Sequence, residues 1–185
     1  MNIYDLYSPI ENEKYVLRLV KKEDCDALFK VYSDINALPF FNSDNCDGDN
    51  FYYATKERMA QALDFWDYAY QNRWFARFTI IDKAAGIIGT VELCLRVSDD
   101  AFDNTCILRV DLRSDKEKED VLYELFSLLL PCLSTLTGDR AVITKVPLYA
   151  VERAKAADRA GFTKSAHYLI GKTGYPYDGY RIKQL

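Results

Sequence analysis

Glu92 is the carboxylate in this sequence that is best placed to act as a general base. It belongs to residues 87–95, where apolar and polar residues alternate, so Glu92 and Thr90 are predicted to face away from the apolar side of a strand. Arg109 and Asp111 have the same orientation on the next predicted strand. Glu92 is either a general base or half of a cross-strand ion pair with Arg109. We favour the ion pair, because a single carboxylate is a weak signal for catalysis.

Residues 113–120 form a polar turn between a predicted strand, residues 105–112, and a helix with an apolar stripe that begins at Val121. Such a turn points the first free N–H groups of the helix beyond the strand end, which suits an anion. Ser114 and Glu117, however, have the spacing of a capping box, in which their own side chains satisfy those N–H groups. The turn is also acidic, which disfavours a phosphate.

The remaining candidate residues are weaker. His167, the only histidine, has no nucleophile pattern near it and is expected to be a packed or surface residue. Tyr149 begins the last predicted helix and is expected either in a pocket or in the core. The five cysteines are widely spaced and contain no CxxC pair, which predicts reduced, mostly buried thiols and neither a disulfide framework nor a metal site.

The length of 185 residues and an apolar fraction of 49% predict a single domain, residues 1–185, with residues 1–14 as an N-terminal extension. A net charge of −4 without a concentrated basic tract argues against nucleic acid or an anionic membrane as the main partner. Because residues 1–14 lack the apolar stretch of a signal peptide and the apolar runs are short, a cytoplasmic location is expected. The oligomeric state is left open, with a homodimer as one alternative.

The predicted elements alternate between strands and helices in an order that is informative by itself. The spacing predicts that residues 89–96 and 105–112 pair as antiparallel strands, and that 105–112 and 141–146 are parallel with a crossover helix between them. The long loop before residue 55 is typical of a functional lid or a mobile segment, and Pro131 is expected to kink or shorten its helix. Strands are predicted at 15–19, 75–82, 87–96, 105–112, 141–146, 162–170 and 180–185, and helices at 22–33, 55–70, 121–133 and 149–160.

This order resembles the fold of the GCN5-related N-acetyltransferases (GNAT). Residues 15–19 with Glu23 and Asp24 resemble the family's first strand and helix start, residues 88–93 its third strand, and residues 160–162 its helix-to-strand joint. Residues 178–180 are similar to the last hairpin of the subgroup that acetylates ribosomal-protein N-termini. The resemblance covers residues 15–185 and implies an α/β (α+β) fold, with a central mixed sheet of about six or seven strands and helices on both faces.

The resemblance also implies transfer of an acetyl group from acetyl-CoA to an amine of a peptide or small molecule. In the family, a strand and the turn after it hold acetyl-CoA, and the turn carries a basic residue and glycines that admit the pyrophosphate. At the positions that match this pattern, residues 117–122, the basic anchor and both glycines are missing, so the pyrophosphate loop is degenerate. The positions that match the family's cofactor site are Val110, Leu112, Glu117, Asp120, Val121 and Leu122.

Two further positions depart from the family. A frequent asparagine falls on Ala150, and the tyrosine that some members use as a general acid falls on Ala157. Three functions are therefore open: an acetyl-CoA-dependent N-acetyltransferase with Glu92 as base, a catalytically inactive GNAT-like module that binds a peptide, an amine or a partner subunit, and an enzyme that uses another acyl carrier. The resemblance to the family favours the acetyl-CoA-dependent enzyme. The degenerate pyrophosphate loop favours the inactive module or the enzyme with another acyl carrier.

Overall fold

The computed structural model describes residues 2–5 and 8–185. Within them, eight strands form one sheet in the order β1-β2-β3-β4-β5-β6-β10-β7, and β8 and β9 form a second, small sheet. The strands are β1 (Ile10–Glu11), β2 (Tyr15–Leu19), β3 (Ala76–Asp82), β4 (Gly86–Leu95), β5 (Cys106–Leu112), β6 (Val142–Lys145), β7 (Thr163–Lys164), β8 (Leu169–Ile170), β9 (Pro176–Tyr177) and β10 (Tyr180–Lys183). The helices are α1 (Cys25–Tyr32), α2 (Lys56–Gln71), α3 (Glu119–Thr137) and α4 (Val151–Arg159), and 3-10 turns occur at η1 (Lys22–Asp24), η2 (Leu38–Phe40) and η3 (Ser114–Lys116).

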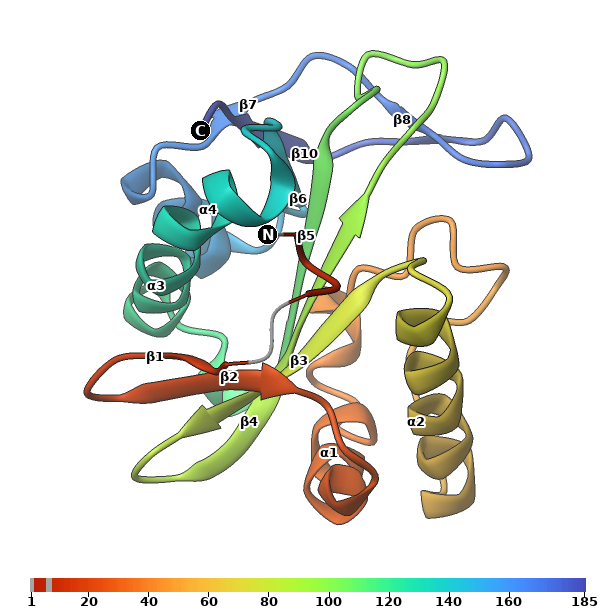
Figure 1. The fold of residues 1–185 in the computed structure, drawn as a ribbon, viewed down its shortest axis with the longest axis vertical. Helices are drawn as coiled ribbons and strands as arrows, with labels where there is room; N and C mark the ends of the chain where they lie inside the picture. Colours follow the sequence, from red (N-terminus) through yellow and green to blue (C-terminus); the bar gives the residue numbers. More distant parts are fainter. Residues whose placement is uncertain (1, 6–7) are drawn as a thin grey trace.

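Helices cover both faces of the large sheet, α1 and α2 on one side and α3 and α4 on the other (Figure 1). The larger core lies between the sheet and α3, and includes Leu108, Val110 and Leu112 of β5. A second core on the α1–α2 side is rich in aromatic residues, among them Tyr32 and Trp66. The predicted mixed α/β sheet with helices on both faces is therefore confirmed. It has one strand more than expected because the short strand β1, which was not predicted, extends one edge.

The predicted strand pairings around β5 are confirmed. β4 and β5 are antiparallel with Glu92 opposite Arg109, and β5 and β6 are parallel, with α3 in the connection between them. In the described chain the parallel ladder joins only Cys106 to Val142 and Ile107 to Ile143. The two strands therefore part after Ile107, while β5 continues to Leu112 alongside β4.

The start of α3 differs from the prediction. Ser114 and Glu117 form no capping box: residues Ser114–Lys116 make a 3-10 turn, and Lys118 precedes the helix without a side-chain cap. The reason is that the Glu117 carboxylate is buried against Arg153 of α4 instead of reaching back to Ser114. Of the two effects expected of Pro131, a kink or a shorter helix, the shortening does not occur, since α3 continues to Thr137 with its apolar residues packed on the sheet.

The C-terminal region is less regular than predicted. Residues 162–170 were expected to form one strand, but β7 pairs with β10 in the large sheet and β8 pairs with β9 in the small one. The predicted N-terminal extension contributes to the fold through Ile3 and Ile10, which are buried in the larger core; its residues 1, 6 and 7 lie outside the described part of the chain.

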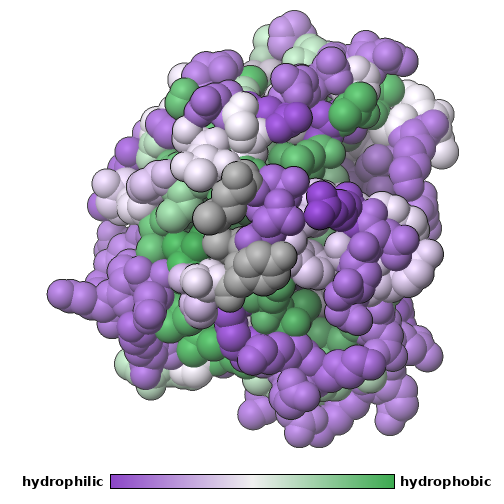
Figure 2. All heavy atoms as spheres, viewed as in Figure 1, coloured by the Kyte–Doolittle hydropathy of each residue, from purple (hydrophilic) through white to green (hydrophobic). Residues whose placement is uncertain are grey.

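One helix among the described residues, α3, is long and apolar enough to cross a membrane by length and composition. Its residues Leu122, Leu125, Phe126 and Leu129 are buried in the larger core, as in the central helix of a globular domain. Seen from the side used for Figure 1, hydrophobic residues reach the surface near the centre of this face and hydrophilic residues surround them (Figure 2).

Candidate functional site

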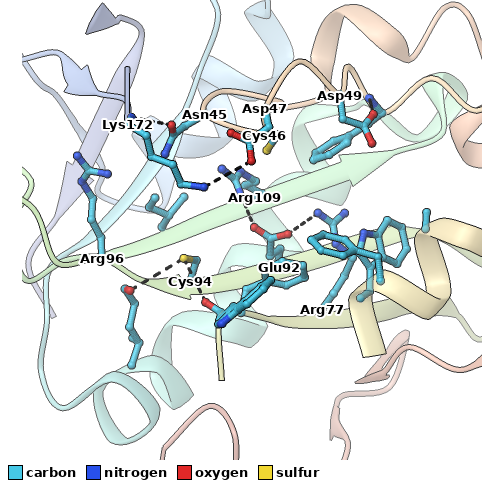
Figure 3. Close-up of a pocket in the computed structure, with 18 of the residues that line it drawn as sticks. Asn45, Cys46, Asp47, Asp49, Arg77, Glu92, Cys94, Arg96, Arg109 and Lys172 are labelled. Carbon is cyan, nitrogen blue, oxygen red and sulfur yellow. Dashed lines mark hydrogen bonds and ion pairs between the residues drawn. The ribbon is translucent and has the colours of Figure 1, made fainter. Parts of the chain in front are cut away.

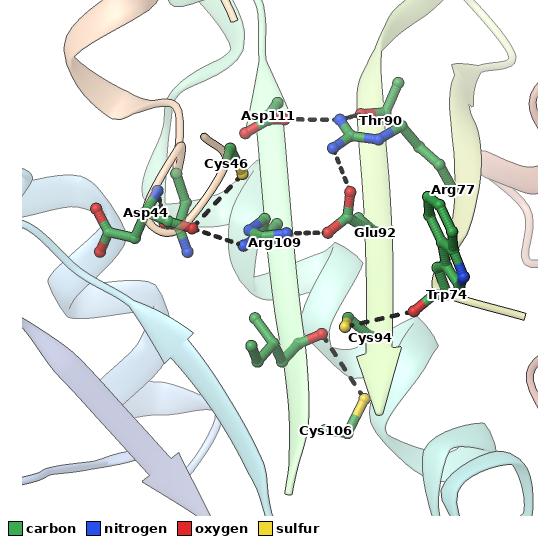
Figure 4. Close-up of polar contacts among 12 residues, drawn as sticks. Asp44, Cys46, Trp74, Arg77, Thr90, Glu92, Cys94, Cys106, Arg109 and Asp111 are labelled. Atoms are coloured by element: carbon green, nitrogen blue, oxygen red, sulfur yellow. Dashed lines mark hydrogen bonds and ion pairs between the residues drawn. The ribbon is translucent and has the colours of Figure 1, made fainter. Parts of the chain in front are cut away.

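Glu92 lies at the centre of a buried ion-pair network on the α1–α2 face of the sheet (Figure 4). One carboxylate oxygen accepts a hydrogen bond from Arg109, its cross-strand partner, and the other accepts from Arg77 of β3 at 2.5 Å. The side chains of Glu92 and Arg77 are only 2% and 1% exposed. The cross-strand ion pair predicted between Glu92 and Arg109 is therefore present, and both oxygens of Glu92 are engaged.

Arg77 connects Glu92 to a second carboxylate. Its guanidinium group donates to Asp111 at 3.0 Å and to the Tyr32 hydroxyl at 2.8 Å, and lies 4.3 Å from the centre of the Trp66 ring. Burial alone would raise the pKa of Glu92, but the charges of Arg109 and Arg77 outweigh it and hold that pKa below its usual value. Burial raises the pKa of Asp111 despite the same Arg77. A carboxylate with a lowered pKa is a weak proton acceptor, so Glu92 is poorly tuned as a base.

Asp44, in the long loop before α2, joins the three strands around the point where β5 and β6 part. Its backbone oxygen accepts from Arg109 of β5 at 3.0 Å. Its carboxylate accepts from Lys145 of β6 at 2.6 and 2.5 Å and from the Tyr180 hydroxyl of β10 at 3.2 Å. These bonds tie the loop, which was expected to be a functional lid or a mobile segment, to β5, β6 and β10.

A pocket of about 780 Å³ opens beside this network, between α2, the loop and the ends of β3, β4 and β5 (Figure 3). Glu92, Arg77 and Arg109 form its polar floor, and the loop contributes Asn45 and Asp49. Six aromatic residues also line the pocket: Phe51, Tyr53, Phe65, Trp66, Trp74 and Phe75. A volume of this size is typical of small-molecule sites.

Two cysteines line the pocket, but neither is a nucleophile at neutral pH. Burial, followed by the charge of Glu92, raises the pKa of Cys94 to about 11, and burial also raises the pKa of Cys46. All five cysteines are free, as predicted, although only Cys106 is buried and the other four are partly exposed. Among the described residues no group of histidine, cysteine or acidic side chains could hold a metal ion.

The turn between β5 and α3 is filled by the protein's own carboxylates. Glu117 accepts two hydrogen bonds of 2.7 Å from Arg153, and both side chains are almost completely buried. Asp34 accepts from the Ser114 N–H at 2.9 Å, and Glu152 accepts from the Glu119 N–H at 3.1 Å. These contacts occupy Arg153 and the N–H groups of Ser114 and Glu119, and they place three carboxylates at the turn, so the turn fits the pyrophosphate of acetyl-CoA poorly.

The six residues that match the family's cofactor positions do not converge on one site. Val110, Leu112 and Leu122 are buried in the larger core, and Val121 packs against it. Glu117 is paired with Arg153, while Asp120 lies at the surface beside Arg159. The four apolar residues of this set pack in the core and do not line the pocket, and a role of the six residues in holding acetyl-CoA stays a prediction.

Two further candidates from the sequence lie outside the pocket. His167 is exposed, in agreement with a surface role. Tyr149 is 61% exposed and its hydroxyl donates to the backbone oxygen of Pro39, so it is neither a core nor a pocket residue.

Sequence reasoning missed Arg77, Arg153 and Asp44. Arg77 and Arg153 look like surface residues in a sequence because arginine is seldom fully buried, and Asp44 lies in a loop without periodicity. Arg77 lies opposite Glu92 because of a one-residue shift at Ile80 and Ile81 in the β3–β4 hairpin, for which the sequence carries no signal.

No protein-family profile and no curated protein matches this sequence. Solved structures do match the whole fold. A GNAT-family acetyltransferase from Bordetella pertussis is 14% identical, with a TM-score of 0.66 over 95% of this chain and 97% of its own. An acetyltransferase from Salmonella typhimurium that modifies the N-terminal serine of a 50S ribosomal subunit protein is 14% identical, with a TM-score of 0.69 over 96% and 99%.

Spermidine N-acetyltransferase from Vibrio cholerae, solved with CoA and spermine, is also similar, with 12% identity and a TM-score of 0.64 over 94% of each chain. These proteins share the order of strands and helices described above over nearly their full length. At such low identity the likeness concerns the fold. The chain therefore has the fold of the GCN5-related N-acetyltransferases.

Proposed function

We propose that this protein transfers an acyl group, such as acetyl, to the amine of a peptide or small molecule that binds in the pocket. The observation that supports this most directly is the position of the pocket. It reaches β5 at Ile107 and Arg109, where β5 leaves β6 in a GNAT fold. The solved relatives acetylate a protein N-terminus and a polyamine, which agrees with an amine as acceptor.

Acyl transfer to an amine needs few groups from the protein. The amine must lose a proton and must be held close to the acyl carbon. In this proposal the aromatic walls of the pocket hold the acceptor, and Arg77 and Arg109 give its floor a fixed shape because Glu92 pairs with both. A cytoplasmic location and action without nucleic acid or a membrane belong to the same proposal, in keeping with the net charge of −4.

The acyl donor is the open part of the proposal. Because the β5–α3 turn fits a pyrophosphate poorly, a donor that lacks this group is the second candidate, favoured by the Glu117–Arg153 pair. We expect a short thioester without a nucleotide, S-acetyl-N-acetylcysteamine, to support transfer to a panel of amines at a rate within about tenfold of the rate with acetyl-CoA. If the nucleotide adds little to binding, the binding free energies of the two donors differ by about 1.4 kcal/mol or less, which corresponds to a factor of at most about ten. Mass spectrometry of the amine products gives both rates.

Control reactions without protein set the background rate for each donor. A preference for acetyl-CoA of several hundredfold would show that the pyrophosphate is recognised after all. Absence of transfer from every donor, with the fold intact by circular dichroism, would contradict the proposed function.

The variant Glu92→Gln distinguishes a structural role of Glu92 in the ion-pair network from a catalytic role as general base. Since both oxygens already accept hydrogen bonds from arginines, we expect the variant to melt at a lower temperature and to keep the shape of the pH–rate profile. The measurements are a thermal melt and turnover at saturating donor between about pH 6 and 9, the range in which a general base near neutrality would titrate. A loss of turnover of ~10²–10⁴-fold at an unchanged melting temperature would instead assign Glu92 as the general base.

A further inference from the structure

The residues that line the pocket carry a net positive charge, although the protein as a whole is negatively charged. The protein has a net charge of −4. In the pocket, three acidic residues, Asp47, Asp49 and Glu92, face twice as many basic ones. The basic residues are Arg58, Arg73, Arg77, Arg96, Arg109 and Lys172. Such a local excess of positive charge attracts an anionic group and repels a polycation.

The acidic residues of the pocket have little capacity left for a cationic ligand. Both oxygens of Glu92 are bound by Arg77 and Arg109. Among the described residues, the buried Nε atoms of Arg77, Arg96 and Arg109 have no hydrogen-bond partner, so the lining holds more donors than acceptors. Asp47 and Asp49 lie in the loop and pair with Lys172 and Arg58. The pocket thus lacks a free carboxylate at its floor for a second amine.

The basic residues at the rim can turn toward a ligand. The side chains of Arg73 and Lys172 are 63% and 69% exposed, and their ion pairs with Asp5 and Asp47 are long, at 3.3 and 3.5 Å. Exposed pairs of this kind contribute little to stability, so an incoming carboxylate can replace the protein's own partner at small cost.

Aromatic rings stand next to these charges. Phe65 and Trp74 are about half exposed although they line the pocket, with ring centres 6.3 Å apart, and Phe75 is 6.1 Å from Phe65. Exposed aromatic faces at the mouth of a cavity favour a ligand with a ring or another flat apolar group.

We propose that the acceptor is an anionic amine that carries an aromatic ring and has about the size of a dipeptide. This inference rests on the proposed function, because it names the substrate class of the same pocket. The ring packs against Phe65 and Trp74, and the carboxylate pairs with Arg73 and Lys172. The amine then lies deeper, toward Arg109 at the divergence of β5 and β6, where the positive charge favours the neutral form of the amine that acyl transfer requires. A polyamine does not fit this charge pattern.

The two tryptophans of the chain both line the pocket, so intrinsic fluorescence reports binding there directly. The probe is the dipeptide phenylalanyl-glutamate, which has no tryptophan, titrated into the full chain without any acyl donor. Leucyl-glutamate lacks the ring, phenylalanyl-glutaminamide lacks the charge, and spermidine represents the polyamines. We expect a saturable change with phenylalanyl-glutamate at the lowest concentration of the four.

The double variant Arg73→Gln with Lys172→Gln should weaken binding of phenylalanyl-glutamate by about tenfold, which is what two exposed charge contacts contribute. Its matched control is Lys164→Gln, an exposed lysine of β7 outside the pocket, which should leave the affinity unchanged. The inference is overturned if spermidine binds more tightly than phenylalanyl-glutamate. It is also overturned if leucyl-glutamate and phenylalanyl-glutaminamide bind as tightly as phenylalanyl-glutamate. Because no donor is present, failure of this titration is distinct from failure of acyl transfer, which the mass spectrometric assay measures.

Discussion

Replacing Arg77 by methionine should lower the free energy of unfolding by ~3–5 kcal/mol, the usual cost of removing one partner of a buried ion pair. Methionine keeps much of the packing against Trp66 but leaves Glu92 and Asp111 without the guanidinium group that now binds both. Chemical denaturation at pH 7 measures the loss. The matched control is Arg58→Met, which removes a pair with Asp49 whose side chains are 43% and 29% exposed and should cost at most about 1 kcal/mol.

The loss in Arg77→Met should depend on pH. Burial raises the pKa of Asp111 even with Arg77 present, so removal of Arg77 moves that pKa further above its value in the unfolded chain. Glu92 keeps Arg109, the largest of the charges that lower its pKa. A carboxyl of this kind destabilises the fold when ionised, so the deficit is greatest at neutral pH and shrinks as the pH falls from the raised folded-state pKa toward the unfolded value of about 4. Equal losses for Arg77→Met and Arg58→Met, or a deficit that grows on acidification, would contradict a buried charge network around Arg77.

Acetyl-CoA at about 1 mM should change the melting temperature of the unmodified protein little or not at all. A donor at 100 times its Kd would stabilise the fold by ~2.7 kcal/mol, a shift of roughly 5–10 °C for a domain of this size. We expect none of this because Glu117 already occupies Arg153, and because Asp34 and Glu152 accept from N–H groups of the turn.

Glu117→Gln should restore part of the shift, since the neutral amide frees Arg153 for a phosphate oxygen. The variant loses stability without ligand, so the quantity to compare is the difference between melts with and without acetyl-CoA. Glu119→Gln is the control: it removes the same charge two residues along, from a pair with the half-exposed Arg159. A full shift in the unmodified protein would show that groups other than this turn hold the donor.

Periodicity in the sequence was sufficient to predict the main elements and their pairing. β2, β3, β4, β5 and β6 lie where alternation of apolar residues placed strands. The shared face of Glu92 and Arg109 also followed from alternation on neighbouring strands. These features depend on residues close in sequence or on a regular repeat, which a single sequence records.

The parts of the site that were not predicted depend on distant residues. Arg153 and Glu117 are 36 positions apart, and Asp44 and Lys145 are 101 apart. The pairing of Arg77 with Glu92 could not be predicted for a different reason. Without the shift at Ile80 and Ile81, the hairpin that starts at Asp82 and Gly86 would pair Arg77 with Val91, and no periodicity reveals a bulge of one residue.

The contacts of Asp44 keep the surrounding loop ordered without a bound ligand. Asn45, Asp47 and Phe51 adopt positive φ angles of 59°, 53° and 65°, conformations that side chains other than glycine rarely adopt. Hydrogen bonds from Arg109, Lys145 and Tyr180 to Asp44 hold this backbone in place before any ligand arrives. The entropy of ordering the loop is therefore lost during folding rather than during binding, so a ligand meets a wall that is already shaped and needs fewer contacts of its own to bind.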